Sequence, residues 1–80
     1  MTRDDVARIV DEVLMQILGV PSDAVATLTR DGSEAWTSLA QVEIFFSLEE
    51  ELGIKLSDDD MAFAESRDDL VEFSVDRLGL

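Results

Sequence analysis

The sequence has 80 residues, of which 46% are hydrophobic, and a formal net charge of −13 at pH 7. This length predicts a single domain spanning residues 1–80, and the hydrophobic fraction is too high for a disordered acidic chain. The negative charge argues against nucleic acid and anionic membrane surfaces as partners, and favours proteins with basic patches. The chain has no cysteine and no histidine. We therefore expect no disulfide, no metal site and no enzyme activity.

The N-terminal residues, MTRDDVARIVDE, are charged where a signal peptide would be apolar. No run of the sequence approaches the ~20 apolar residues that a membrane span needs. These features predict a cytoplasmic protein without membrane insertion, and we expect a monomer.

A first helix is predicted to begin after Thr2, which forms a capping box with Asp5. The helix ends at Gly19, which is followed by Val20 and Pro21. Its apolar residues recur with the helical period: Val6, Ile9, Val10, Val13, Leu14, Ile17 and Leu18.

Residues 21–37 predict a long crossover, with a helical turn starting at Pro21-Ser22-Asp23 and a turn at Asp31-Gly32. A connection of this length in a small domain needs a reason, because such loops are uncommon unless they are functional. Three apolar residues offer points by which it can lie across a bundle: Val25, Leu28 and Trp36.

Three further helices follow. The second is predicted from about Ser38 to Gly53, the third from the cap Ser57 through Phe63, and the fourth from the cap Ser66. The apolar side of the fourth helix consists of Leu70, Val71, Phe73, Ser74, Val75 and Leu78. No strand alternation occurs, so we predict an all-α fold: a small helical bundle of three main helices and one short helix, with the long crossover between the first two.

The acidic run Asp58-Asp59-Asp60 is predicted to be a solvated helix start, and Met15 and Met61 are predicted to fill the core.

The second helix carries two apolar stripes when its residues are placed at about 100° each. The first stripe consists of Ile44, Phe45, Leu48 and Leu52, with Gln41 at its edge. The second consists of Leu39, Val42 and Phe46, flanked by Glu43, Glu49 and Glu50, and is called the acid-rimmed strip below. The first stripe is enough to hold the helix to the first and fourth helices, which leaves the acid-rimmed strip as a docking surface. The alternative is that both stripes are buried in a bundle that surrounds this helix.

Two residues fit the cap of this helix. Ser38 forms a capping box with Gln41, and Thr37 fits the cap position equally well. If Thr37 is the cap, Ser38 lies in the first turn with its hydroxyl free. No histidine is present to activate that hydroxyl as a nucleophile, but the helix N-terminus offers amide donors and a partial positive charge to a phosphoester.

An acidic chain with an LGV-P turn after its first helix, and Ser-Leu opening a helix that runs to LEEELGI, resembles the acyl carrier proteins. The resemblance covers essentially the whole chain and is strongest over residues 38–54. It implies an acyl-carrier-like bundle in which a phosphopantetheinyl transferase attaches 4′-phosphopantetheine, taken from coenzyme A, to Ser38. It further implies that the terminal thiol holds acyl, polyketide or aminoacyl intermediates as thioesters and presents them to partner enzymes with basic patches. The residues that the resemblance assigns to partner binding are Thr37, Leu39, Val42, Glu43, Phe46, Glu49 and Glu50.

The sequence departs from the family at the attachment site. Thr37 stands where the family usually has aspartate, and Ala40 stands where many members are acidic. Trp36 and Phe46 indicate a specialised biosynthetic carrier. The alternative function is an unmodified, carrier-like acidic protein that binds a partner through the second helix.

Overall fold

Each α-helix begins at a hydroxyl side chain that accepts a hydrogen bond from the backbone three residues further on. The computed structural model describes residues 1–80 and contains α1 (Arg3–Leu18), the 3-10 helix η1 (Val25–Thr27), α2 (Ser38–Leu52), α3 (Asp58–Phe63) and α4 (Arg67–Leu78). The caps are Thr2, Thr37, Ser57 and Ser66. This arrangement confirms the all-α fold with three main helices and one short helix.

The helices are stopped by glycine where the sequence predicts it. Gly19 ends α1 with φ 68° and Gly53 ends α2 with φ 65°, and both donate their backbone N–H to a carbonyl of the last turn. This left-handed conformation is easy for glycine and closes the helix. None of the helices combines the length and apolar character that crossing a membrane requires.

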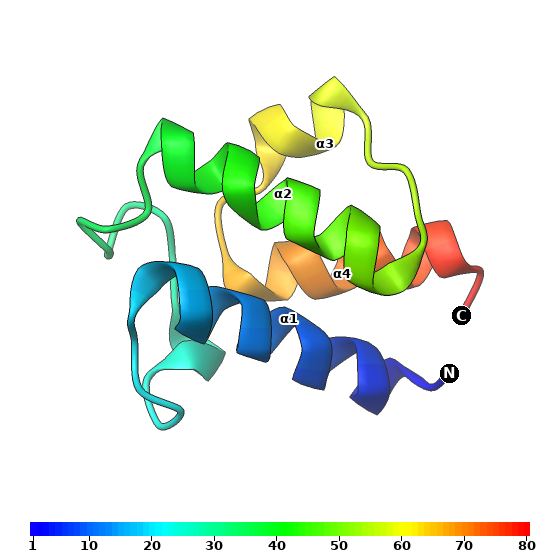
Figure 1. Ribbon diagram of the computed structural model, residues 1–80, viewed down its shortest axis with the longest axis horizontal. Coiled ribbons are helices and arrows are strands. Elements are labelled where there is room, and N and C mark those ends of the chain that lie inside the picture. The colour runs from blue at the N-terminus through cyan, green and yellow to red at the C-terminus, as the bar shows by residue number, and fades with distance from the viewer.

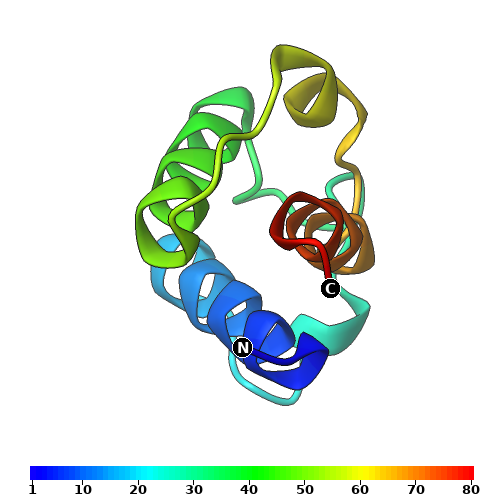
Figure 2. The same cartoon turned by 90° about the vertical axis from the view of Figure 1, so that its right-hand side faces the viewer.

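The bundle is organised around α1. Its close neighbours are α2 and α4, while α3 packs on α2 and η1 packs on α1 and α4 (Figure 1). In the view turned by 90°, α4 lies across the molecule from α2, and α3 lies at the end away from α1 (Figure 2). The predicted packing of the second helix on the first is therefore confirmed. The fourth helix is not a close neighbour of α2, and the two helices share only the core to which both contribute.

The core is one cluster of 16 buried apolar residues. The share that α2 contributes consists of Ala40, Ile44, Phe45, Leu48 and Leu52. These residues include the whole first stripe predicted from the sequence. Met15 and Met61 were predicted to fill the core; they pack against the cluster from partly buried positions at its edge.

The long crossover is attached to the bundle by side chains. Val25 and Trp36 are buried and Leu28 is partly buried, which confirms the predicted points of contact. The predicted helical turn is present as a turn over residues 22–24 followed by η1. The crossover is therefore an ordered part of the fold.

Backbone hydrogen bonds pin the middle of the crossover to the segment between α3 and α4. The Arg30 N–H donates to the Glu65 carbonyl at 2.8 Å, and the Arg67 N–H donates to the Leu28 carbonyl at 2.9 Å. The two segments thus form a single antiparallel bridge. It fixes the backbone on both sides of residue 29.

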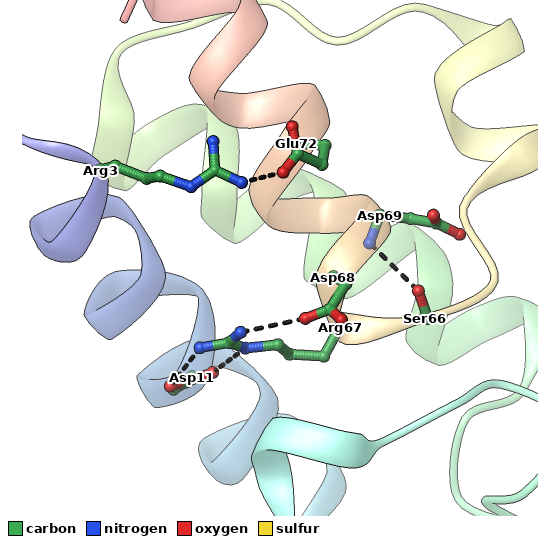
Figure 3. A network of polar contacts seen from close by, with 7 residues as sticks. All are labelled: Arg3, Asp11, Ser66, Arg67, Asp68, Asp69 and Glu72. Atoms are coloured by element: carbon green, nitrogen blue, oxygen red, sulfur yellow. Dashed lines mark hydrogen bonds and ion pairs between the residues drawn. The ribbon is translucent and has the colours of Figure 1, made fainter.

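Arg67 joins the start of α4 to α1 (Figure 3). Its Nε and Nη2 donate to the two carboxylate oxygens of Asp11 at 2.7 and 3.1 Å, and its Nη1 donates to Asp68 at 3.1 Å. The hydrogen bonds to Asp11 are the main cause that raises the pKa of Arg67. Burial acts in the opposite direction but is weaker, so the guanidinium stays charged. Arg3 and Glu72 form a second ion pair between α1 and α4.

Asp60 ties the short helix α3 to α4. Its carboxylate accepts the backbone N–H of Ser57 at 3.0 Å and pairs with Arg77. Burial acts to raise the pKa of Asp60, but the hydrogen bonds from Ser57 and Arg77 outweigh it and hold the pKa below its ordinary value. The ionised form is therefore favoured in the folded protein.

This shift predicts how stability depends on pH. Because the folded pKa of Asp60 lies below the ordinary value of 3.8, its contribution is present above that value and is lost as pH falls through the folded pKa. We expect Asp60→Asn to lower the free energy of unfolding by about 1 kcal/mol at neutral pH, and the difference from wild type to shrink in acid. Urea titrations from pH 7 to pH 3 measure this. The control is Asp59→Asn, an exposed position in the same turn; a difference that stays constant with pH would contradict the prediction.

Candidate functional site

Ser38 is the first residue of α2, and its hydroxyl is not used as a cap. Thr37 is the N-cap: its side-chain oxygen accepts the backbone N–H of Ala40 at 3.2 Å. Ser38 is exposed, and its Oγ accepts a hydrogen bond from Arg30 Nη2 at 3.4 Å. Of the two capping alternatives, the structure has the one that leaves the serine free.

The Ser38 hydroxyl opens on a pocket between α2 and α3. This open pocket has a volume of about 400 Å³ and is lined by Arg30, Ser38, Gln41, Val42, Asp58, Met61 and Ala62. Its walls combine aliphatic side chains with one cation, Arg30, one carboxylate, Asp58, and hydrogen-bonding groups. The backbone N–H groups of the first turn of a helix lack intrahelical acceptors and point toward this end of α2. The pocket therefore places apolar surface and the Arg30 guanidinium beside the Ser38 hydroxyl.

The acid-rimmed strip lies on the surface of α2. The exposed fractions of Leu39, Val42 and Phe46 are 70%, 43% and 68%, whereas Phe45 is only 1% exposed. The alternative in which both stripes are buried is therefore wrong. The physical reason is that α1 and α3 cover only part of the helix circumference, which leaves one face without a neighbour.

The three glutamates beside the strip lie in different surroundings. Glu43 and Glu50 are exposed, as a rim for a charged partner requires. Glu49 is partly buried, and its Oε2 accepts the backbone N–H of Leu56 at 2.9 Å. Glu49 therefore helps to hold the connection between α2 and α3, and the free carboxylates of the rim are those of Glu43 and Glu50.

Gln41 fixes α3 next to the pocket. It is 2% exposed; its Oε1 accepts the Trp36 indole N–H at 2.6 Å, and its Nε2 donates to the carbonyls of Met61 at 2.7 Å and Ala64 at 3.2 Å. From the sequence, Gln41 is expected at the edge of the buried stripe and as the capping-box partner of Ser38; the second expectation is wrong, because Thr37 is the cap and the Gln41 side chain turns to Trp36 and α3. One signal in the sequence could have identified the role of Gln41 in holding α3: it is a polar residue on the core side of a helix. A buried amide needs hydrogen-bond partners, and these must come from neighbouring segments.

Two more residues of this region were not assigned a role from the sequence. Arg30 contacts Ser38 from the crossover, eight residues earlier in the chain. Phe63, at the end of α3, is 71% exposed and adds a further large apolar group to the molecular surface. The exposure of Phe63 could not be predicted from the sequence. A helix of six residues is too short for the spacing of its apolar residues to show which of them face the core.

The region thus combines a free serine at a helix start, a pocket beside it and an exposed apolar strip with an acidic rim. Each feature comes from α2 or from a segment held against it. Comparison of the sequence with known protein families found no matching family, and comparison with curated proteins found no matching relative.

Proposed function

We propose that the protein is an acyl carrier protein, which carries 4′-phosphopantetheine on Ser38 and presents acyl, polyketide or aminoacyl groups to partner enzymes. The observation that supports this most directly is the free Ser38 hydroxyl at the first position of α2, facing a pocket. When attached, the arm supplies a terminal thiol that holds its cargo as a thioester. We assign this activity to the cytoplasm.

Ser38 supplies the oxygen to which the arm is attached. The Oγ–phosphorus bond forms as a phosphoanhydride bond of coenzyme A breaks, and adenosine 3′,5′-bisphosphate leaves. The hydroxyl proton passes to a base of the phosphopantetheinyl transferase, because this chain has no histidine. The chain itself contributes an accessible hydroxyl and amide donors that favour an anion at the helix start.

The acid-rimmed strip is the proposed docking surface for the transferase and for the enzymes that load and process the cargo. Leu39, Val42 and Phe46 provide apolar contact area, and Glu43 and Glu50 provide charge at its edge. A net charge of −13 attracts partners with basic patches at long range, and the small apolar strip gives the contact its position.

Intact-mass measurement tests the proposed function. The protein is incubated with coenzyme A and a broad-specificity phosphopantetheinyl transferase. We expect the wild type to gain the mass of one phosphopantetheinyl group, Ser38→Ala to gain none, and the control Ser22→Ala, at an exposed loop serine, to be modified normally. An adduct on Ser38→Ala would contradict the proposal.

A wild type that stays unmodified, while a known acyl carrier is modified in the same reaction, would also contradict it. Thr37 is the residue that favours this second outcome, because it lacks the carboxylate usual before the attachment serine. The exposed strip would then serve the alternative function, partner binding by an unmodified acidic protein.

A further inference from the structure

Arg30 is the arginine next to Ser38, and it forms no ion pair. Its Nη2 contacts only the Ser38 hydroxyl, at 3.4 Å. The other arginines all pair with carboxylates: Arg3, Arg8, Arg67 and Arg77. In a chain with 19 acidic and six basic residues, a guanidinium without a carboxylate partner is an unusual arrangement.

The fold holds Arg30 in place. The backbone N–H of Arg30 is bonded to the Glu65 carbonyl, and the neighbouring Arg67 to Leu28 bond closes the bridge on its other side. The side chain is half-buried and lines the same pocket as Ser38. Arg30 is therefore presented to the serine by a fixed backbone, although it lies in a long connection.

We infer that Arg30 binds the phosphate of modified Ser38 and is a positioning residue for the attached arm; this rests on the proposed function. Modification places a negative charge on the phosphate bonded to Ser38 Oγ, the atom that Arg30 already contacts. The carboxylate of Asp58 lines the same pocket and repels that charge, so Arg30 is the cation that compensates. A weak contact to a neutral hydroxyl is thereby replaced by a charge-assisted one, with the planar fork that suits phosphate.

The test compares thermal stability before and after modification. Because Arg30 gains a partner only in the modified protein, we expect modification to raise the Tm of the wild type by about 4 °C. Arg30→Met should lose most of this increase, and Arg30→Lys should keep part of it. The control Arg8→Met, whose partner is Glu12 on the same helix, should keep all of it. The increase in the wild type should diminish as salt is added.

A second measurement needs no modified variant. In NMR spectra of the wild type, the side-chain N–H signal of Arg30 should shift and exchange more slowly after modification, while the corresponding signal of Arg8 stays unchanged. Equal Tm increases in wild type and Arg30→Met, together with an unshifted Arg30 signal, would overturn the inference while leaving the proposed function intact. A wild type that cannot be modified would overturn both.

Discussion

Replacing Phe45 with alanine is expected to unfold a large part of the protein population, whereas the same replacement at Phe46 leaves the stability almost unchanged. The two side chains are neighbours in α2, but Phe45 is 1% exposed and Phe46 is 68% exposed. Deleting a buried phenylalanine costs about 3–5 kcal/mol. A single core of this size supplies a net stability of only about 3–5 kcal/mol, so the loss consumes most of it. Exposed substitutions usually change stability by less than about 0.5 kcal/mol.

The loss at Phe45 is large because its surroundings are closed. Ile44 and Leu48 on the same helix and Leu14 on α1 are fully buried in the same cluster. Helices on several sides of the cluster limit how far the structure can collapse into the space left by the ring, and such a residual cavity adds to the cost.

Urea unfolding followed by far-UV circular dichroism measures both variants. We expect the midpoint of Phe45→Ala to fall close to zero urea, and that of Phe46→Ala to match the wild type with an unchanged slope. Comparable losses in the two variants would mean that the separation of α2 into a core stripe and a surface strip is wrong. A stable Phe46→Ala would instead show that this ring is not needed by the fold, as the proposed docking role requires.

Local patterns were sufficient to predict most of the fold. The capping box of Thr2 and Asp5 and the glycine stop at Gly19 involve residues within one or two turns of each other, so sequence spacing describes them fully. The separation of Phe45 from Phe46 was also predictable. Adjacent residues differ by about 100° around a helix axis, and only one of the two can share a face with Leu48.

The details of the candidate site depend on contacts between distant segments, which no local pattern contains. The Gln41 amide is satisfied in the core because the carbonyls of Met61 and Ala64, 20 and 23 positions further along the chain, accept its hydrogen bonds. Arg30 meets Ser38 because the crossover is pinned to the segment before α4. The choice between Thr37 and Ser38 as the cap was open from the sequence, since both have the required hydroxyl, and the backbone path decided it.

Gln41→Glu is expected to destabilise the protein by at least about 3 kcal/mol at neutral pH, although the two side chains have nearly the same shape. The Gln41 amide group donates to two carbonyls and accepts from Trp36 in a site that is almost fully buried. A carboxylate can keep only the bond from Trp36. It leaves two carbonyls without a donor and places a negative charge against their oxygens, and burying such a charge without a cation is costly.

The destabilisation should depend on pH in a direction that identifies its cause. Burial disfavours the charged carboxylate, and the neutral acid can donate to one of the carbonyls. Both effects raise the pKa of the introduced carboxyl above its unfolded value of about 4.3. The folded state of the variant therefore prefers the protonated form. Relative to wild type, the stability loss is smallest below about pH 4 and grows as pH rises through the folded pKa.

Trp36 provides the measurement, because it is the chain's single tryptophan and contacts the substituted side chain directly. Its fluorescence, recorded with far-UV circular dichroism between pH 4 and pH 8, distinguishes local release of α3 from global unfolding. The control Gln16→Glu makes the same change of charge at an exposed position of α1 and should cost less than about 0.5 kcal/mol at every pH.

If Gln41→Glu behaves like this control, the amide does not hold α3 to α2. If it destabilises without any dependence on pH, the cause is packing rather than a buried charge. The expected result would show that the Gln41 side chain positions one wall of the Ser38 pocket. Met61 lines that pocket, and its carbonyl accepts a hydrogen bond from Gln41.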